Sequence, residues 1–90
     1  RPVVKENSEF VLDVDSVIMS IGTSPNPLIK STTEGLDTEK WGGIIADENG
    51  LTSRANVYAG GDAVTGAATV ILAMGDGRKA AASMHEELSK

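Results

Sequence analysis

The chain has 90 residues, contains no cysteine and carries a formal net charge of −5 at pH 7. This length suits one small domain or part of a larger one, and the lack of cysteine excludes disulfides, iron–sulfur ligands and thiol chemistry within the chain. No basic cluster indicates a nucleic-acid partner. The longest apolar run, 67–74, is far shorter than the ~20 residues of a membrane helix, so no membrane partner is expected. Without a visible signal peptide, we expect a cytoplasmic protein.

The first third of the sequence predicts strands followed by a break. Val3–Val4 predicts a short strand, and residues 10–14 alternate between apolar and polar side chains, as in a strand with one buried face. Residues 17–21 are almost continuously apolar, which is typical of a strand in a sheet covered on both faces. Two prolines flank Asn26, so the backbone leaves the sheet there, and we expect a short helix over 28–33.

The rest of the chain predicts short strands and one long helix. Strands are expected at 44–46, 51–53 and 57–59, and a turn at 47–50, because Asn49-Gly50 tolerates positive φ. Apolar and small residues then recur at three- and four-residue spacing over 68–88, which predicts a helix against the sheet. The recurring residues are Val70, Met74, Gly77, Ala81, Met84 and Leu88. The predicted fold is α/β, a small sheet plus a long C-terminal helix.

The stretch Val57–Ala81 places one aspartate, Asp62, in a glycine-rich turn between a strand and this helix. A helix N-terminus presents free N–H groups and about half a positive charge, which attract electron-rich groups. The carboxylate of Asp62 accepts hydrogen bonds, so a ligand with sugar hydroxyls and a polarised ring would fit. The alternative is that Asp62 only caps the turn and the glycines only permit tight packing. Both interpretations stay open on local physics.

Two stretches carry a resemblance to a known family. TSRANVYAGGDAVTGAATVILAMGDGRKAA, residues 52–81, resembles the C-terminal signature of two-dinucleotide-domain flavoprotein oxidoreductases, and its second half is most similar to the small (beta) subunit of NADPH-dependent glutamate synthase. VDSVIMSIGTSPNP, residues 14–27, resembles the strand and turn with which the NAD(P) domain of these Rossmann-like proteins returns the chain to the FAD domain. The two stretches lie in the expected order and together cover most of the chain.

The resemblance implies a role for particular residues. Asp62 would bond a ribityl hydroxyl of FAD, and the turn at Gly60 and Gly61 would let the cofactor approach. The next helix would aim backbone N–H groups at the pyrimidine end of the isoalloxazine ring, and would stabilise negative charge on the reduced flavin. These N–H groups lie near Ala68, Thr69 and Val70. No catalytic side chain and no metal ligand is assigned to this chain.

The resemblance also implies that the chain is a C-terminal fragment. Residues 1–27 would end the NAD(P)-binding domain and 28–90 would form the C-terminal part of the FAD-binding domain. No G-x-G-x-x-G fingerprint is present, so the ADP halves of FAD and NAD(P)H have no site here. The parent protein would use FAD, NAD(P)H and iron–sulfur clusters, with the remainder of the flavoprotein chain and a glutamate synthase large subunit or other electron-acceptor subunit as partners. The isolated chain would be inactive.

Other candidate sites are weaker. His85 has no Ser or Cys partner, and the carboxylates of Asp13 and Asp15 alone make a poor metal site. Asp47–Gly50 lacks the downstream glutamate of a calcium loop, and Trp41 is expected to pack under a loop rather than to stack on a ligand.

Two further alternatives stay open. Gly22 and Pro25 would lie near the interface of the two nucleotide domains, although a plain strand end and turn explain them equally well. The alternative to an oxidoreductase fragment is a non-catalytic scaffold or protein-interaction module that keeps the same fold remnant.

Overall fold

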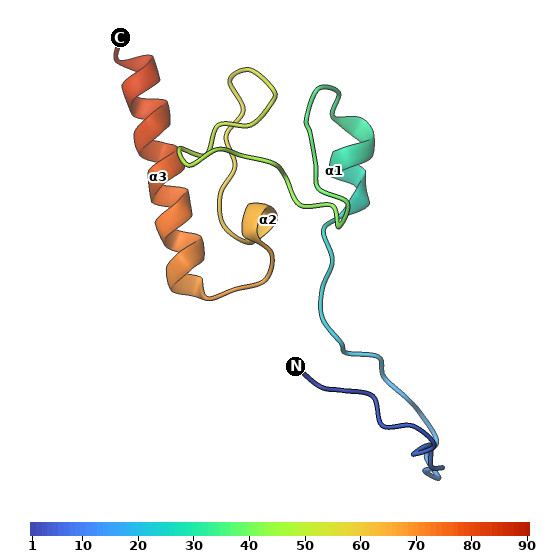
Figure 1. The fold of residues 1–90 in the computed structure, drawn as a ribbon. Helices are drawn as coiled ribbons and strands as arrows, with labels where there is room; N and C mark the ends of the chain where they lie inside the picture. Colours follow the sequence, from blue (N-terminus) through green and yellow to red (C-terminus); the bar gives the residue numbers. More distant parts are fainter.

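The computed structural model describes all residues from 1 to 90. It contains three helices, α1 (Pro27–Thr32), α2 (Asp62–Thr65) and α3 (Val70–Leu88). In Figure 1, α3 runs along one side of the folded part, α1 lies on the other side and the single turn of α2 lies between them. None of these helices combines the length and the apolar character that crossing a membrane requires.

The N-terminal residues 1–24 extend away from the rest of the chain as an arm (Figure 1). The arm raises the radius of gyration to 18.7 Å, whereas a compact chain of this length would have about 12 Å. Every residue of the arm is exposed, and its only hydrogen bond runs from the Ser8 hydroxyl to the Lys5 carbonyl, 2.7 Å. The strands expected over 3–4, 10–14 and 17–21 are therefore not formed, because no backbone group of the arm meets a partner strand in this chain.

The helix α1 follows the break at the two prolines, as predicted. The side chain of Asn26 accepts a hydrogen bond from the backbone N–H of Leu28, 3.0 Å, and Pro27 occupies the first helical position. Pro is favoured there because its missing N–H would have no partner anyway. The helix therefore begins one residue earlier than the periodicity indicates, and it ends at Thr32.

The middle of the chain consists of short antiparallel segments joined by tight turns and does not form a continuous sheet. The turn predicted at Asp47–Gly50 is formed, with the Gly50 N–H donating to the Asp47 carbonyl at 3.0 Å and the Asp47 side chain accepting from the N–H groups of Asn49 and Leu51. Around this turn the expected strands pair only at isolated β-bridges of one residue pair each, and these bridges are all that is formed of the predicted small sheet. The bridges are Thr38–Ile44, Ala46–Thr52 and Leu51–Tyr58.

The long helix α3 forms over Val70–Leu88, close to the predicted 68–88. Thr69 is extended, with φ −91° and ψ 153°, and its hydroxyl oxygen accepts a hydrogen bond from the Leu72 N–H, 3.3 Å. This is the geometry of an N-cap residue, and it explains why the helix begins two residues later than the small residues around it suggest.

The face of α3 that packs differs from the apolar face that its periodicity indicates. The covered residues are Ala73, Asp76, Ala80 and Ser83, of which only Ala80 is buried. At 100° per residue this covered face lies about a quarter turn from the apolar face predicted to meet a sheet. Most large side chains of α3 therefore remain exposed, including Val70 at 74%, Met74 at 64% and Leu88 at 86%.

Close packing against α3 comes from glycines of the turns, not from glycines of the helix. A Cβ at Gly60 would lie 2.9 Å from the carbonyl carbon and oxygen of Asp76, and one at Gly50 would lie 2.9 Å from the Cβ of Ala80. A methyl group at Gly75 or Gly77, by contrast, would meet no atom within 4 Å. These two helical glycines therefore face away from the covered side of α3 and make no close approach within this chain.

A matched pair of substitutions tests this packing. Gly60→Ala should lower the free energy of unfolding by about 1–3 kcal/mol, because the added methyl group meets the backbone of α3. Gly77→Ala should raise it by up to about 1 kcal/mol, because alanine is the better helix former and the site is open. Urea unfolding followed by circular dichroism at 222 nm measures both. A Gly60→Ala variant as stable as the wild type would contradict the contact between this turn and α3.

Candidate functional site

The glycine-rich turn around Asp62 is held between α3 and the middle of the chain. Gly61 has φ 79° and Gly66 has φ 84°, conformations that side chains disfavour, and the single turn of α2 lies between them. The Ile44 N–H donates a hydrogen bond of 2.7 Å to the Ala63 carbonyl, which fixes this helical turn to the central turns. The sequence predicts the glycine turn but not the helical turn inside it.

The carboxylate of Asp62 is available to a ligand. Asp62 is exposed and its side chain makes no hydrogen bond, and the residue that caps α2 is Gly61, without a side-chain bond. Only the main chain of Asp62 is used, since its carbonyl accepts from the Gly66 N–H at 3.0 Å. The interpretation that Asp62 merely caps the turn therefore lacks the hydrogen bond that it requires.

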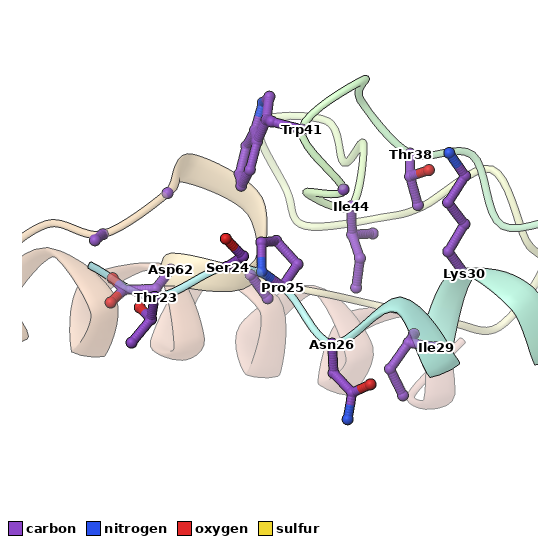
Figure 2. A pocket seen from close by; sticks show the side chains of 14 residues that line it. Thr23, Ser24, Pro25, Asn26, Ile29, Lys30, Thr38, Trp41, Ile44 and Asp62 are labelled. Atoms are coloured by element: carbon purple, nitrogen blue, oxygen red, sulfur yellow. The ribbon is translucent and has the colours of Figure 1, made fainter. Parts of the chain in front are cut away.

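A pocket of about 320 Å³ forms where the two family-like stretches meet. Its walls come from residues 23–26 at the end of the N-terminal arm, from α1, from the segment around Asp62, and from the central turn that carries Trp41. Figure 2 shows Asp62 and Thr23 at one end of this pocket, Lys30 at the other end, and Trp41 above Pro25. Residues about 40 positions apart in the sequence thus share one hollow, which the spacing of the motifs alone does not reveal.

The N-terminus of α3 lies just after this pocket in the chain. Ala67 lines the pocket, whereas Ala68, Thr69 and Val70 are exposed residues beyond its lining. The backbone N–H groups of Val70 and Ile71 find no acceptor within the chain, as at most helix N-termini. The candidate residues thus form two neighbouring groups, the carboxylate in the pocket and the free N–H groups at the start of the helix.

Gly60 and Gly61 have a structural role that needs no ligand. Gly60 lies under the Asp76 backbone, and a Cβ at Gly61 would lie 3.5 Å from the Cα of Ala73. Gly60 also lines a second hollow of about 310 Å³ on the side of Lys79, away from the Asp62 pocket. Tight packing against α3 accounts for Gly60, and the φ of 79° accounts for Gly61, whether or not a ligand binds beside them.

The remaining sequence candidates do not join the pocket, with two exceptions, Pro25 and Trp41. Pro25 lines it, but Gly22, with φ 128°, has no atom within 4 Å of the position that a Cβ would occupy. His85 is an exposed residue in the last turn of α3. Asp13 and Asp15 lie on the exposed arm, and no group of three or more potential metal ligands gathers anywhere in the chain.

The C-terminus carries an ion pair between Lys90 and Glu87. The Lys90 ammonium donates a hydrogen bond of 2.7 Å to the Glu87 carboxylate, and this bond and the charge of Glu87 raise the pKa of Lys90. This exposed pair lies at the end of α3 opposite the Asp62 pocket, so it has no part in the candidate site.

Trp41 and Lys30 are among the lining residues that the sequence does not predict. Trp41 is expected to pack under a loop, yet it lines the pocket with 48% of its surface exposed. Lys30 on α1 also lines the pocket, and no sequence signal marks it. The signal that could identify Trp41 is its position directly before two glycines, which leave room for its ring.

Comparison with known protein families identifies the class of protein to which this chain belongs. The profile described as pyridine nucleotide-disulphide oxidoreductase matches residues 1–77. The chain belongs to the pyridine nucleotide-disulphide oxidoreductase family. The match covers the arm, the pocket and the first part of α3, and it confirms the resemblance that residues 14–27 and 52–81 carry. This oxidoreductase family membership supports the Rossmann-like fold class, although the chain itself forms little sheet.

Individual proteins with similar sequences support the assignment of this chain to the oxidoreductases. It is 45% identical over 85 residues to "Putative oxidoreductase AegA" of Escherichia coli, covering 90% of this chain and 13% of that protein. It is 38% identical over 86 residues to the glutamate synthase (NADPH) small chain of Azospirillum brasilense, covering 93% of this chain and 18% of the relative. The Escherichia coli glutamate synthase (NADPH) small chain is 34% identical over 85 residues, with 90% and 18% covered. The chain thus spans less than a fifth of the length of these relatives.

The free state of the Asp62 carboxylate leads to a stability prediction. Asp62→Asn should change the free energy of unfolding by no more than about 0.5 kcal/mol, because no hydrogen bond of the side chain is lost. Thr69→Ala is the matched control and should lower it by about 1 kcal/mol, since it removes the cap of α3. Thermal and urea unfolding measure both variants. A loss at Asp62 as large as that at Thr69 would mean that the carboxylate serves the fold.

Proposed function

We propose that this chain is part of an FAD-dependent NAD(P)H oxidoreductase, most similar to the glutamate synthase small subunit, and that it forms one wall of the flavin site. The observation that carries the proposal is that the Asp62 carboxylate lines the pocket between residues 14–27 and 52–81 and makes no hydrogen bond within the chain. The relatives are oxidoreductases by name, and the small chains of glutamate synthase are named for NADPH.

The residues present fit one end of the cofactor. The pocket of about 320 Å³ suits a ring system with a hydroxylated chain, and Asp62 would accept hydrogen bonds from the ribityl hydroxyls. The free N–H groups at the start of α3, near Ala68, Thr69 and Val70, would face the pyrimidine end of the ring. No group in the chain fits the ADP half, because the sequence has no G-x-G-x-x-G turn.

When bound, FAD would accept a hydride from NAD(P)H and release electrons one at a time to iron–sulfur centres elsewhere in the protein. The part of this chain is electrostatic. The dipole and orphan donors at the start of α3 favour negative charge beside them, and they are already oriented by the helix, so they need not reorganise during the reaction. Asp62 orients the cofactor through its hydroxyls, and no side chain here is required to carry a proton.

The exposed apolar side chains of this chain favour the remainder of the flavoprotein as its partner. Large apolar side chains stay exposed on the arm, among them Val4 at 92% and Ile21 at 90%, and along α3, where Ile71 is 82% exposed. Large apolar side chains exposed in such number usually contact other protein. Residues 1–27 would then complete the NAD(P)-binding domain and 28–90 the FAD-binding domain, and a glutamate synthase large subunit or another electron-acceptor subunit would receive the electrons.

Loss of the carboxylate should weaken FAD binding. In the complete polypeptide that carries this sequence, Asp62→Ala should raise the Kd for FAD about ten- to a hundredfold, because charge-assisted hydrogen bonds contribute ~1.5–3 kcal/mol. Reconstitution of the apoprotein with FAD measures the Kd, and Glu48→Ala, an exposed carboxylate outside the pocket, is the control. An unchanged Kd in Asp62→Ala would refute the assignment of the flavin site.

The exposed face of α3 gives a second test. Met74→Glu should leave the stability of the 90-residue chain within about 0.5 kcal/mol of wild type, because Met74 is 64% exposed there. In the complete polypeptide the same substitution should lower the free energy of unfolding by about 2 kcal/mol or more, because the new carboxylate would be buried against the domain that covers α3. Parallel unfolding experiments compare the two backgrounds. Equal effects in both would show that nothing covers this face, and would favour a free-standing interaction module.

A further inference from the structure

Trp41 is the only tryptophan of the chain, and its ring lies over Gly43 at the pocket. Gly43 is buried, and a Cβ at this position would collide with the six-membered ring of Trp41. The φ of Gly43 does not lie in the left-handed range, so the backbone does not require glycine there. The space for the Trp41 ring is therefore the reason that residue 43 lacks a side chain.

The same edge of the ring, at Cη2, also lies near the loop that follows Asp62. A Cβ at Gly66 would lie 3.8 Å from the Cη2 atom of Trp41, an ordinary van der Waals contact. The ring thus spans from its own turn to the segment that carries the candidate flavin ligand. Its packing over Gly43 restricts the orientations that the ring can take.

The ring is nevertheless only half covered. Trp41 keeps 48% of its surface exposed, and it lines the same pocket as Pro25 and Asp62. Figure 2 shows the ring above Pro25, on the side of the pocket where Asp62 lies rather than at the end of Lys30. An ordered aromatic surface that opens into a pocket beside a free carboxylate suits a flat ring bearing a hydroxylated chain.

We propose that Trp41 is a flavin-contacting residue whose indole ring packs against the isoalloxazine ring while Asp62 holds the ribityl chain. This inference rests on the proposed flavin site and adds to it the residue that recognises the ring. It corrects the sequence interpretation of Trp41 as loop packing only. The role is one of binding and of water exclusion at the ring, since indole neither titrates nor transfers a hydride.

The test compares two substitutions of Trp41 in the complete polypeptide. Trp41→Leu removes the aromatic surface and should raise the Kd for FAD about three- to tenfold, the range that an aromatic pair contributes. Trp41→Phe keeps an aromatic ring and a similar shape, so it should retain the Kd within about threefold. The fluorescence of bound flavin should rise in both variants, because an indole in contact with excited isoalloxazine quenches it by electron donation and neither leucine nor phenyl does.

Controls separate contact from structure and this inference from the flavin site itself. Tyr58→Phe removes the hydroxyl of the tyrosine outside the pocket and should change neither the Kd nor the emission. A weaker Kd in Trp41→Leu with unchanged emission in both Trp41 variants would indicate a structural role and overturn the contact. If Asp62→Ala weakens FAD binding while both Trp41 variants match wild type in Kd and emission, the flavin site stands and the Trp41 inference fails. If all these variants match wild type, both proposals fail.

Discussion

The close approach of the glycine turn to α3 is the contact on which the folded part of this chain depends. At Gly60 the turn lies so near the backbone of Asp76 that a methyl group would not fit, and at Gly50 the same holds against Ala80. Ala80 is also the only fully buried apolar residue outside the glycines. With so little core, the helix and the turns are joined by backbone proximity rather than by large interlocking side chains.

This contact also determines what Asp62 can do. With Gly60 and Gly61 packed toward α3, the next residue lies at the pocket, and its carboxylate finds no partner in the chain. The hydrogen bond from Ile44 to Ala63 fixes the turn from the other side. A free acidic side chain on a restrained backbone is suited to ligand binding, because little conformational freedom remains to be lost when the ligand arrives.

The same geometry leaves the apolar stripe of α3 and the apolar arm without cover. Glycines and alanines can meet at short distance on one face of the helix, and the larger residues lie about a quarter turn away. An almost continuously apolar segment such as 17–21 is typical of a strand that has neighbouring strands in a sheet and protein covering both faces of that sheet. The relatives are more than five times longer than the matched segment, and this agrees with the proposal that further protein supplies those neighbours.

The sequence by itself determined the family, the helix over about 68–88, the short helix after the two prolines and the turn at Asp47–Gly50, because these depend on local signals such as periodicity, proline and Asn-Gly. It also singled out Asp62, but it could not separate a capping role from a free carboxylate. Only the tertiary structure decided that question, the covered face of α3, the unpaired state of 17–21 and the place of Trp41 at the pocket. Each of these depends on contacts between residues far apart in the chain, and periodicity in one segment carries no information about which distant backbone will lie against it.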